Sequence, residues 1–237
     1  MRDTAGSVVG HVPNAPATRD FRDGLSPDAQ IEFESISTVA DFPPESTLFV
    51  EQETPKIMRL LMSGQVKLSM NSNVGRRVIL GIAYPGETLG LASIFSGSRY
   101  EITAETLSPC RILSVARENF LRFLRCHPSA CISVSRELCM EYSRACEKVR
   151  RLGLAITASA KLVSFLLEEC ATPQNTEHGT RLFCSLTHGE IGECIGVSRE
   201  TVTRLFSDFK GRELLESRGS TLIISNRRAL EAYAGIG

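Results

Sequence analysis

The chain has 237 residues, of which 42% are hydrophobic and 23% are charged, and this composition is that of an ordinary globular protein with room for about two domains. It excludes a disordered chain, a collagen-like chain and a small scaffold held together by disulfides. The 27 Lys and Arg residues balance the 27 Asp and Glu residues, so no overall positive charge indicates a nucleic acid or a membrane as partner. Any such partner has to be inferred from local features.

No hydrophobic run approaches the roughly 18 to 20 residues that a membrane-spanning helix needs. Residues 1–20 also lack the basic start and the apolar stretch of a secretory signal. We therefore expect a cytoplasmic protein with no membrane partner. The eight cysteines include no CxxC pair, and in a reducing cytosol we expect them to be free thiols that pack as small core residues.

Residues 1–25 mix Gly, Pro, Asp and Arg with few large apolar side chains, and we expect a loose N-terminal arm. Residues 26–127 are expected to form a mostly β domain with flanking helices. Short apolar or alternating runs, separated by turn residues, are typical of the strands of a sandwich or barrel. The expected strands are 47–50, 57–62, 65–70, 77–82, 102–104 and 111–114.

Helical periodicity begins after these strands. A short helix is predicted over 117–125, and Pro128 opens the longest helix of the chain, within the segment 128–153. Residues spaced alternately by four and three form a heptad-like seam of the kind that meets another helix. The seam consists of Cys131, Ser135, Leu138, Tyr142, Ala145, Val149 and Leu152.

We expect this seam to be a dimer interface. Because Ile132, Cys139 and Cys146 widen the apolar face, we also expect the helix to pack on the β domain of its own chain. Gly153 is a helix breaker that places a hinge and a domain boundary at this point.

The C-terminal domain, 154–237, is predicted to start with a helix over 159–170 and a polar loop over 172–179. Thr187 and Glu190 form a capping-box pattern that starts a short helix. After a turn at 196–198, a second helix runs from Arg199 to about Lys210. Its buried stripe is Val202, Leu205, Phe206 and Phe209. The segments 214–217 and 221–224 then form a pair of strands beside the two helices.

A helix, a tight turn and an amphipathic second helix make a helix-turn-helix, whose second helix enters the major groove of DNA. Arg can donate two hydrogen bonds to guanine, Glu can accept from cytosine, and Thr offers a hydroxyl and a methyl group. The candidate DNA-binding residues are Thr187, Ser198, Arg199, Glu200, Thr203, Arg204, Ser207 and Arg218.

The alternative is an ordinary solvated helix face laced by salt bridges. Residues 155–237 carry a net charge of minus one, whereas nucleic-acid-binding domains are usually basic. DNA binding therefore requires that the edge facing the duplex be locally positive.

The segment 192–204, GECIGVSRETVTR, closely resembles the recognition segment of the CRP/FNR family of bacterial transcription regulators. Residues 46–113 resemble the cyclic-nucleotide-binding-type β-roll of that family, including Gly64, the turn at 85–87 and Gly90. The resemblance covers roughly residues 40 to 235. It implies an α+β protein with an N-terminal β-roll, or jelly-roll, sensor domain, a long dimerisation helix and a C-terminal winged helix-turn-helix domain.

The resemblance also implies a homodimer that reads a near-palindromic double-stranded DNA, activating or repressing transcription, with RNA polymerase as a further partner. It places Arg199, Glu200 and Arg204 at base- and phosphate-contacting positions. Arg199 with Glu200 looks like the branch that reads a GTGA-type half-site. Thr203 stands where the oxygen-responsive branch often has a hydroxyl group.

The effector side departs from the family pattern. In cyclic-AMP receptors a Gly-Glu-Leu segment and an Arg-Ser pair hold the ribose and the cyclic phosphate. Here the corresponding stretches begin at Gly90 and Tyr100, and the adenine-contacting pair of the long helix aligns with Ala145 and Cys146. The candidate pocket residues are Gly90, Leu91, Ser93, Arg99, Tyr100, Glu101 and Cys146.

A carboxylate at Glu101 would repel a phosphate, and Arg99 could pair with it only after a shift of one residue in strand register. We therefore do not expect cyclic AMP as effector. An iron–sulfur cluster of the family type needs several N-terminal cysteines in addition to the one that Cys110 matches, and the first 109 residues contain none. His127 has no paired ligand, so we do not expect haem either, and the sequence implies no cofactor.

A thiol switch at Cys139 and Cys146 stays open. Seven residues along one helix span about 10 Å, more than the roughly 7 Å that a disulfide tolerates between Cα atoms. Only an intersubunit or rearranged bridge would therefore work.

Two other functional classes compete with a DNA-binding regulator. An enzyme with a nucleophilic cysteine needs a nearby His base and an orienting acid, and no spacing in the sequence supplies them, so we do not expect an enzyme. The other class is a cyclic-nucleotide-binding or thiol-redox sensor module whose tail contacts protein. Salt-dependent binding to a palindromic duplex would distinguish the regulator from this module.

Overall fold

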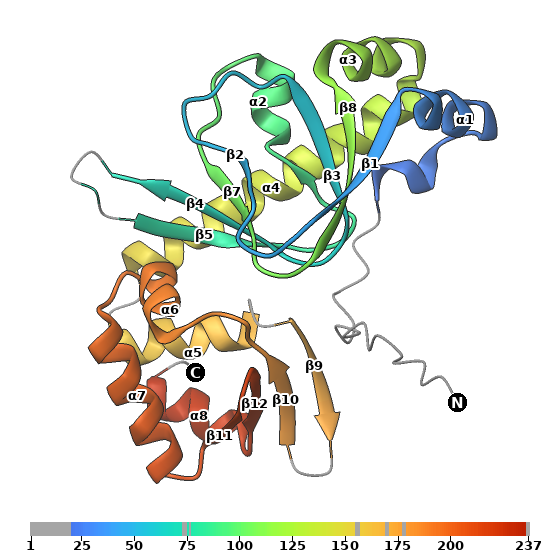
Figure 1. Cartoon of the computed structure of the whole chain (residues 1–237). Coiled ribbons are helices and arrows are strands. Elements are labelled where there is room, and N and C mark those ends of the chain that lie inside the picture. Colours follow the sequence, from blue (N-terminus) through green and yellow to red (C-terminus); the bar gives the residue numbers. More distant parts are fainter. Residues whose placement is uncertain are drawn as a thin grey trace, which may run out of the picture.

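The computed structural model describes residues 20–72, 75, 77–154, 157–168, 171–176 and 179–235. The N-terminal part contains two antiparallel sheets that face each other, and the C-terminal part, from residue 157 onward, is a smaller unit of helices and short strands (Figure 1). One sheet has the order β1 (Ser37–Phe42), β8 (Cys110–Ala116), β3 (Ile57–Ser63) and β6 (Thr88–Leu89). The other has the order β2 (Thr47–Phe49), β7 (Thr103–Thr106), β4 (Val66–Asn71) and β5 (Arg77–Ala83).

The first sheet separates two parts of the core, because side chains alternate between the faces of a strand. On β3, Met58 and Leu60 face the helices, whereas Leu61 faces the second sheet. Strand β8 repeats the pattern, with Leu113 on the helix side and Ile112 on the inter-sheet side. This arrangement confirms the predicted β-roll, and β1 is a strand that the sequence analysis did not predict.

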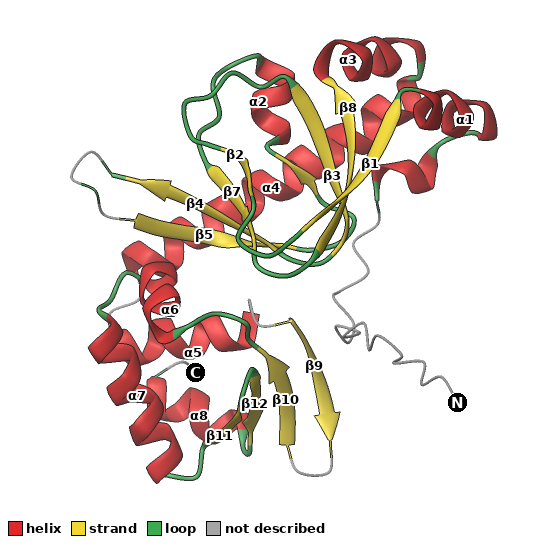
Figure 2. Cartoon of the chain, in the orientation of Figure 1, coloured by secondary structure: helices red, strands yellow, loops and turns green. Residues whose placement is uncertain are grey.

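Helices cover the outer face of the first sheet (Figure 2). They are the 3-10 helix η1 (Phe21–Gly24), α1 (Pro27–Ser35), α2 (Leu91–Ser96), α3 (Arg117–Cys126) and part of α4 (Pro128–Leu154). Phe21 is buried, and its ring lies 5.3 Å from that of Phe33 and 5.9 Å from that of Phe120. Residues 20–25 of the expected loose arm are therefore packed against the domain, and residues 1–19 lie outside the described part.

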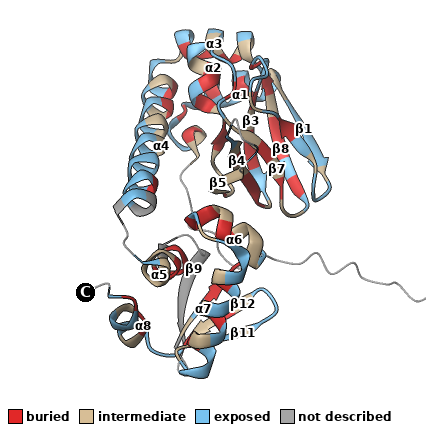
Figure 3. Ribbon diagram, turned by 90° about the vertical axis from the view of Figure 1, so that its left-hand side faces the viewer, coloured by how far each residue is buried: buried red, intermediate tan, exposed pale blue. Residues whose placement is uncertain are grey.

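Helix α4 is the longest described helix and continues through Gly153 to Leu154, so Gly153 does not end it. Its contact with the β domain is made by Ala130, Val134 and the half-buried Leu138. Ile132, Cys139 and Cys146, which we expected to widen this contact, are exposed instead. The outward face of α4 is exposed over most of its length (Figure 3).

The C-terminal unit contains α5 (Ala158–Glu168), α6 (His188–Ile195), α7 (Arg199–Gly211) and α8 (Arg227–Ala234). Its sheet has the order β11 (Leu215–Arg218), β12 (Thr221–Ile224), β10 (Gly179–Phe183) and β9 (Ala171–Thr176). The loop predicted over 172–179 is wrong, because its described residues are strand. A polar edge strand held by backbone pairing has no hydrophobic alternation to reveal it.

We find no helix in the described chain that is both long enough and apolar enough to span a bilayer.

Candidate nucleic-acid interface

Two reciprocal hydrogen bonds start α6. The amide of Glu190 donates to Thr187 Oγ1 at 3.2 Å, and the amide of Thr187 donates to Glu190 Oε2 at 2.9 Å, which confirms the capping box. The helix ends at Gly196, which has a φ of 71°, a conformation that glycine adopts without steric cost. At Gly192 a Cβ atom would lie 2.7 Å from the carbonyl oxygen of Val197, so this close approach of the turn to α6 requires glycine.

The second helix, α7, is anchored by its apolar stripe. Ser198 Oγ accepts from the amide of Thr201 at 3.2 Å, and Val202, Phe206 and Phe209 are buried. The opposite face carries Arg199, Glu200, Thr203, Arg204 and Ser207, all of which are exposed. This face is therefore available to an external partner.

The charged groups of this face are not laced together by salt bridges. Within the described residues, neither Arg199 nor Arg204 forms an ion pair. Asp208 is engaged on another side of the helix, where it accepts from Arg212 Nε at 3.0 Å and from the hydroxyl of Tyr233. The solvated-face alternative therefore lacks the ion pairs that it requires at the two arginines.

Glu200 is exposed, and a hydrogen bond from its own backbone amide, followed by one from Ser198, lowers the pKa of its carboxyl group. It is therefore an ionised acceptor at neutral pH. Arg218 is exposed next to Gly219, at the turn between β11 and β12. Its Nη2 lies 3.4 Å from Glu216 Oε2, a surface pair that binds weakly.

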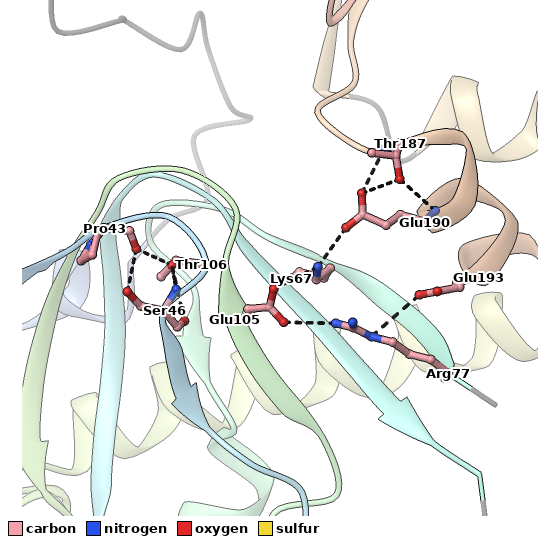
Figure 4. Close-up of polar contacts among 9 residues, drawn as sticks. All are labelled: Pro43, Ser46, Lys67, Arg77, Glu105, Thr106, Thr187, Glu190 and Glu193. Carbon is pink, nitrogen blue, oxygen red and sulfur yellow. Dashed lines mark hydrogen bonds and ion pairs between the residues drawn. The ribbon is translucent and has the colours of Figure 1, made fainter. Parts of the chain in front are cut away.

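Two residues that the sequence analysis missed connect the β-roll to α6 (Figure 4). Lys67 of β4 is only 6% exposed at its side chain, and its Nζ lies 2.9 Å from Glu190 Oε1 and 3.3 Å from Glu105 Oε1. Arg77 of β5 pairs with Glu105 at 3.3 Å and with Glu193 at 3.8 Å. These ion pairs thus connect the β-roll to the first helix of the helix-turn-helix.

An apolar contact accompanies these ion pairs. Ile79 of β5 is buried within the core of the C-terminal unit, and Ile82 packs against the same core. A cavity of about 300 Å³ lies beside them between β5 and the α6–α7 turn, lined among others by Val78, Glu193 and Val197. The alternation of side chains along β5 could have predicted that an isoleucine such as Ile79 faces away from the β-roll, but not that the C-terminal unit covers it.

Two of the candidate effector residues, Gly90 and Tyr100, meet inside the β-roll, whereas Leu91 lies on the helix side of the first sheet. Tyr100 is 2% exposed, stacks on Phe49 at 4.0 Å between ring centroids and donates from its hydroxyl to the carbonyl of Ile57 at 3.3 Å. A Cβ atom on Gly90 would lie 2.7 Å from the Tyr100 ring. Leu91 is fully buried.

The polar candidates have other partners. Arg99 Nη1 donates to the carbonyl of Gln52 at 2.9 Å, and Ser93 Oγ donates to the carbonyl of Arg99 at 3.4 Å. Glu101 is exposed, and Cys146 is exposed on α4. The guanidinium beside Tyr100 belongs to Arg59, which the sequence analysis missed. Burial lowers the pKa of Arg59, against the opposing effect of Tyr100 and Glu53.

The cysteines divide between the core and the surface. Cys110, Cys184 and Cys194 are buried, and burial raises the pKa of the Cys110 thiol. Cys139 and Cys146 are exposed, so the expectation that they fill the core is wrong. The other described thiols are Cys126, which is exposed, and Cys131, which is half-buried.

His127 contacts Glu32, with 2.9 Å between its Nε2 and the carboxylate Oε2. In the described ranges no group of three or more His, Cys, Asp or Glu side chains is placed to hold a metal ion.

Along the seam of α4, Ser135, Tyr142, Ala145 and Val149 are exposed, whereas Cys131 and Leu138 are half-buried. Leu152 lies in α4, and its side chain is outside the described part. The exposed fraction reaches 73% for Tyr142 and 71% for Val149, which is unusually high for two large side chains on the same face of one helix.

Two family models match the chain. Residues 39–127 match a cyclic nucleotide-binding domain, and residues 160–233 match a Crp-like helix-turn-helix domain. The chain is 24% identical over 197 residues to the cAMP-activated global transcriptional regulator CRP of Pasteurella multocida (strain Pm70), an alignment that covers 83% of this chain and 94% of that protein. It is 27% identical over 213 residues to the CRP-like cAMP-activated global transcriptional regulator of Mycobacterium tuberculosis (strain CDC 1551 / Oshkosh), with 89% and 94% covered.

Solved structures share the fold. A CooA mutant from Carboxydothermus hydrogenoformans has a TM-score of 0.76 at 18% identity, covering 93% of this chain and 98% of that one. FixK2 from Bradyrhizobium japonicum has a TM-score of 0.71 at 21% identity, covering 83% and 96%. Since both domain models occur in the order of the observed domains and the relatives match along almost their whole length, the chain belongs to the CRP/FNR family of DNA-binding transcription regulators.

Proposed function

We propose that the chain works as a homodimer that binds a near-palindromic duplex through α7. The observation that carries this proposal is the outward face of α7, where Arg199, Glu200, Thr203 and Arg204 are exposed opposite a buried apolar stripe. These side chains supply the donors and acceptors that base edges require. Thr187, Ser198, Ser207 and Arg218 are proposed to contact the duplex around them.

The dimer is proposed to form along the exposed seam of α4, in the segment 128–153. Exposed apolar side chains on one helix face are typical of an interaction surface, a heptad spacing favours pairing with another helix, and the family resemblance implies that the pair is parallel. In such a dimer the two recognition helices would reach half-sites about 34 Å apart. The C-terminal domain, 154–237, would bind DNA, and the family implies RNA polymerase as a further partner in the cytoplasm.

We propose that cyclic AMP is not the effector. By the family resemblance, Leu91 and Tyr100 align with residues that hold the ribose and the phosphate in cyclic-AMP receptors, and in this chain both side chains are buried. Glu101, the residue after Tyr100, would repel an anion. Neither Leu91 nor Tyr100 can supply a charge-assisted hydrogen bond to a phosphate, which supports this proposal. We also propose that the chain is not an enzyme.

Selection of duplexes from a random pool tests the function. The full-length protein should enrich a near-palindrome, with affinity that falls steeply as salt concentration rises. Repeating the selection with cyclic nucleotide, oxidant and haem would identify the class of effector, and cyclic AMP should leave the result unchanged. A protein that enriches no sequence, or that binds every duplex equally, would contradict the proposal and favour a module that contacts protein.

A further inference from the structure

Thr203, in the middle of the exposed face of α7, is held by a side chain from the other helix of the motif. Its Oγ1 lies 3.0 Å from Nδ1 of His188, the first residue of α6. The imidazole is itself fixed, because it stacks on the ring of Phe206 with 4.7 Å between centroids and 16° between planes. Phe206 belongs to the buried core.

The orientation of Thr203 follows from this contact. The β-carbon of threonine carries one hydroxyl and one methyl group, and fixing the direction of one fixes the other. A hydroxyl that turned toward a base would have to leave His188. Burial, with Lys210 and Arg199 as further causes, lowers the pKa of His188, so the ring is neutral at neutral pH and brings no charge to the interface.

Resting on the proposed DNA-binding function, we propose that His188 sets the base preference of Thr203. By holding the Thr203 hydroxyl, it leaves the methyl group to contact the 5-methyl of a thymine in the major groove. His188 is thus a positioning residue that acts on specificity through Thr203. Apolar contact with the thymine methyl is one of the ways in which a major groove is read.

The probe is uracil, which differs from thymine only by lacking the 5-methyl group. Each thymine of the selected half-site is replaced in turn, and binding of the full-length protein is measured by fluorescence anisotropy. At one position the replacement should weaken wild-type binding by about fourfold per half-site, the effect of removing one buried methyl. His188→Phe keeps a ring on Phe206 but removes the nitrogen, and should reduce this effect to below about twofold.

Variants of Thr203 separate positioning from a merely structural role. Thr203→Val keeps a methyl in either orientation and should retain the full uracil effect, whereas Thr203→Ser should lose it. In the Thr203→Val background, His188→Phe should no longer change the uracil effect, because no hydroxyl remains to be held. Melting temperatures of all four variants confirm that each is folded.

Three results would overturn the inference: no thymine position sensitive to uracil in the wild type, a full uracil effect in folded His188→Phe, or loss of the effect in Thr203→Val. If His188→Phe does not fold, the two Thr203 variants still decide, since the inference requires that valine and serine behave oppositely. A wild-type protein that binds no duplex contradicts the proposed function itself, and the inference falls with it.

Discussion

Glu137 of α4 is a carboxyl group held against the β-roll. The amide of Thr88 donates to its Oε1 at 2.6 Å and the hydroxyl of Thr88 donates to its Oε2 at 3.1 Å. Burial nevertheless raises its pKa to about 7, with Glu87 and Asp20 acting in the same direction. One turn later, burial and then Glu137 raise the pKa of Glu141 to about 7, against the effect of Arg144. Both groups thus titrate near neutral pH.

Glu137→Gln should make the protein more stable at pH 8. Between pH 4.5, the usual pKa, and about 7, the folded state binds more protons than the unfolded state. The free energy of unfolding therefore falls as pH rises through this interval and levels off above it. Replacing Glu137 should recover about 3 kcal/mol at pH 8 and little at pH 5, as measured by urea unfolding.

The exposed Glu147→Gln on the same helix is the control and should change neither value. An unchanged difference between pH 5 and pH 8 in Glu137→Gln would contradict the assignment.

Arg199→Ala should weaken binding to the selected duplex by about 1 to 3 kcal/mol and relax the preference at one base pair, because a bidentate contact to guanine is lost. Affinities for the four base pairs at each half-site position measure the effect. Arg122→Ala removes an exposed arginine from α3, in the other domain, and should leave both the affinity for the duplex and the base preference unchanged. A loss that is uniform across all sequences would assign Arg199 to a phosphate instead.

At the scale of elements, α4 uses two faces differently. Ala130 and Val134 are buried against the β domain, whereas Tyr142 and Val149 are exposed. One helix therefore has a face satisfied within the chain and a face that is not. The exposed face is the element on which the proposed dimer depends.

Tyr142→Asp should weaken the dimer. If each of two tyrosines loses about 2 kcal/mol of burial, association weakens by roughly a thousandfold. Sedimentation velocity over a range of protein concentrations measures this change. Ser143→Asp introduces the same group at the neighbouring exposed position, off the seam, and should leave the dimer intact; equal behaviour of the two variants would exclude this face as the interface.

Several elements of the motif were predictable because their signals are local. The capping box at Thr187 and Glu190, the glycine turn and the stripe of α7 each depend on residues within a few positions. Strand β9 was missed because its pairing with β10 involves backbone groups and not a hydrophobic pattern. The outward position of Cys139 and Cys146 depends on which side of α4 meets the sheet, which periodicity does not decide.

The candidate site shows the same division. The exposed side chains of α7 follow from helical spacing, which puts them on the face opposite the buried stripe. The contact of His188 with Thr203 depends on how two helices cross, and that of Lys67 with Glu190 joins residues 123 positions apart. Both arise only from tertiary packing.

At the scale of the whole molecule, the β-roll and the C-terminal unit are held together by ion pairs and by the apolar packing of β5. Lys67 contacts both Glu105 and Glu190, and Ile79 enters the neighbouring core. Although burial acts to raise it, hydrogen bonds from Lys67 and then from Thr187 lower the pKa of Glu190. This carboxylate therefore stays ionised at neutral pH and keeps its lysine partner.

Lys67→Met should destabilise the protein by about 2 kcal/mol, less than the 3 to 5 kcal/mol of a fully buried pair because the two carboxylates remain partly exposed. The rate of amide hydrogen exchange should also increase more in α6 than in α3, since the contact of Lys67 with α6 is lost. The matched substitution Lys56→Met removes an exposed lysine of the same domain and should change neither quantity. Unaltered exchange in α6 would show that the ion pairs do not hold the two units together.

The two carboxylate oxygens of Glu190 have different partners. Oε1 accepts from Lys67, whereas Oε2 accepts from the amide of Thr187 at the start of α6. If the helix-turn-helix moved away from the β-roll, Glu190 would lose only its Oε1 contact with Lys67. Its Oε2 contact with Thr187 would still hold the first turn of α6. A separation of the two units would therefore leave the helix-turn-helix intact. Separating the two units requires breaking the Lys67 and Arg77 ion pairs, the hydrogen bond of Ser185 to Gln65 and the packing of Ile79 and Ile82, but not unwinding α6.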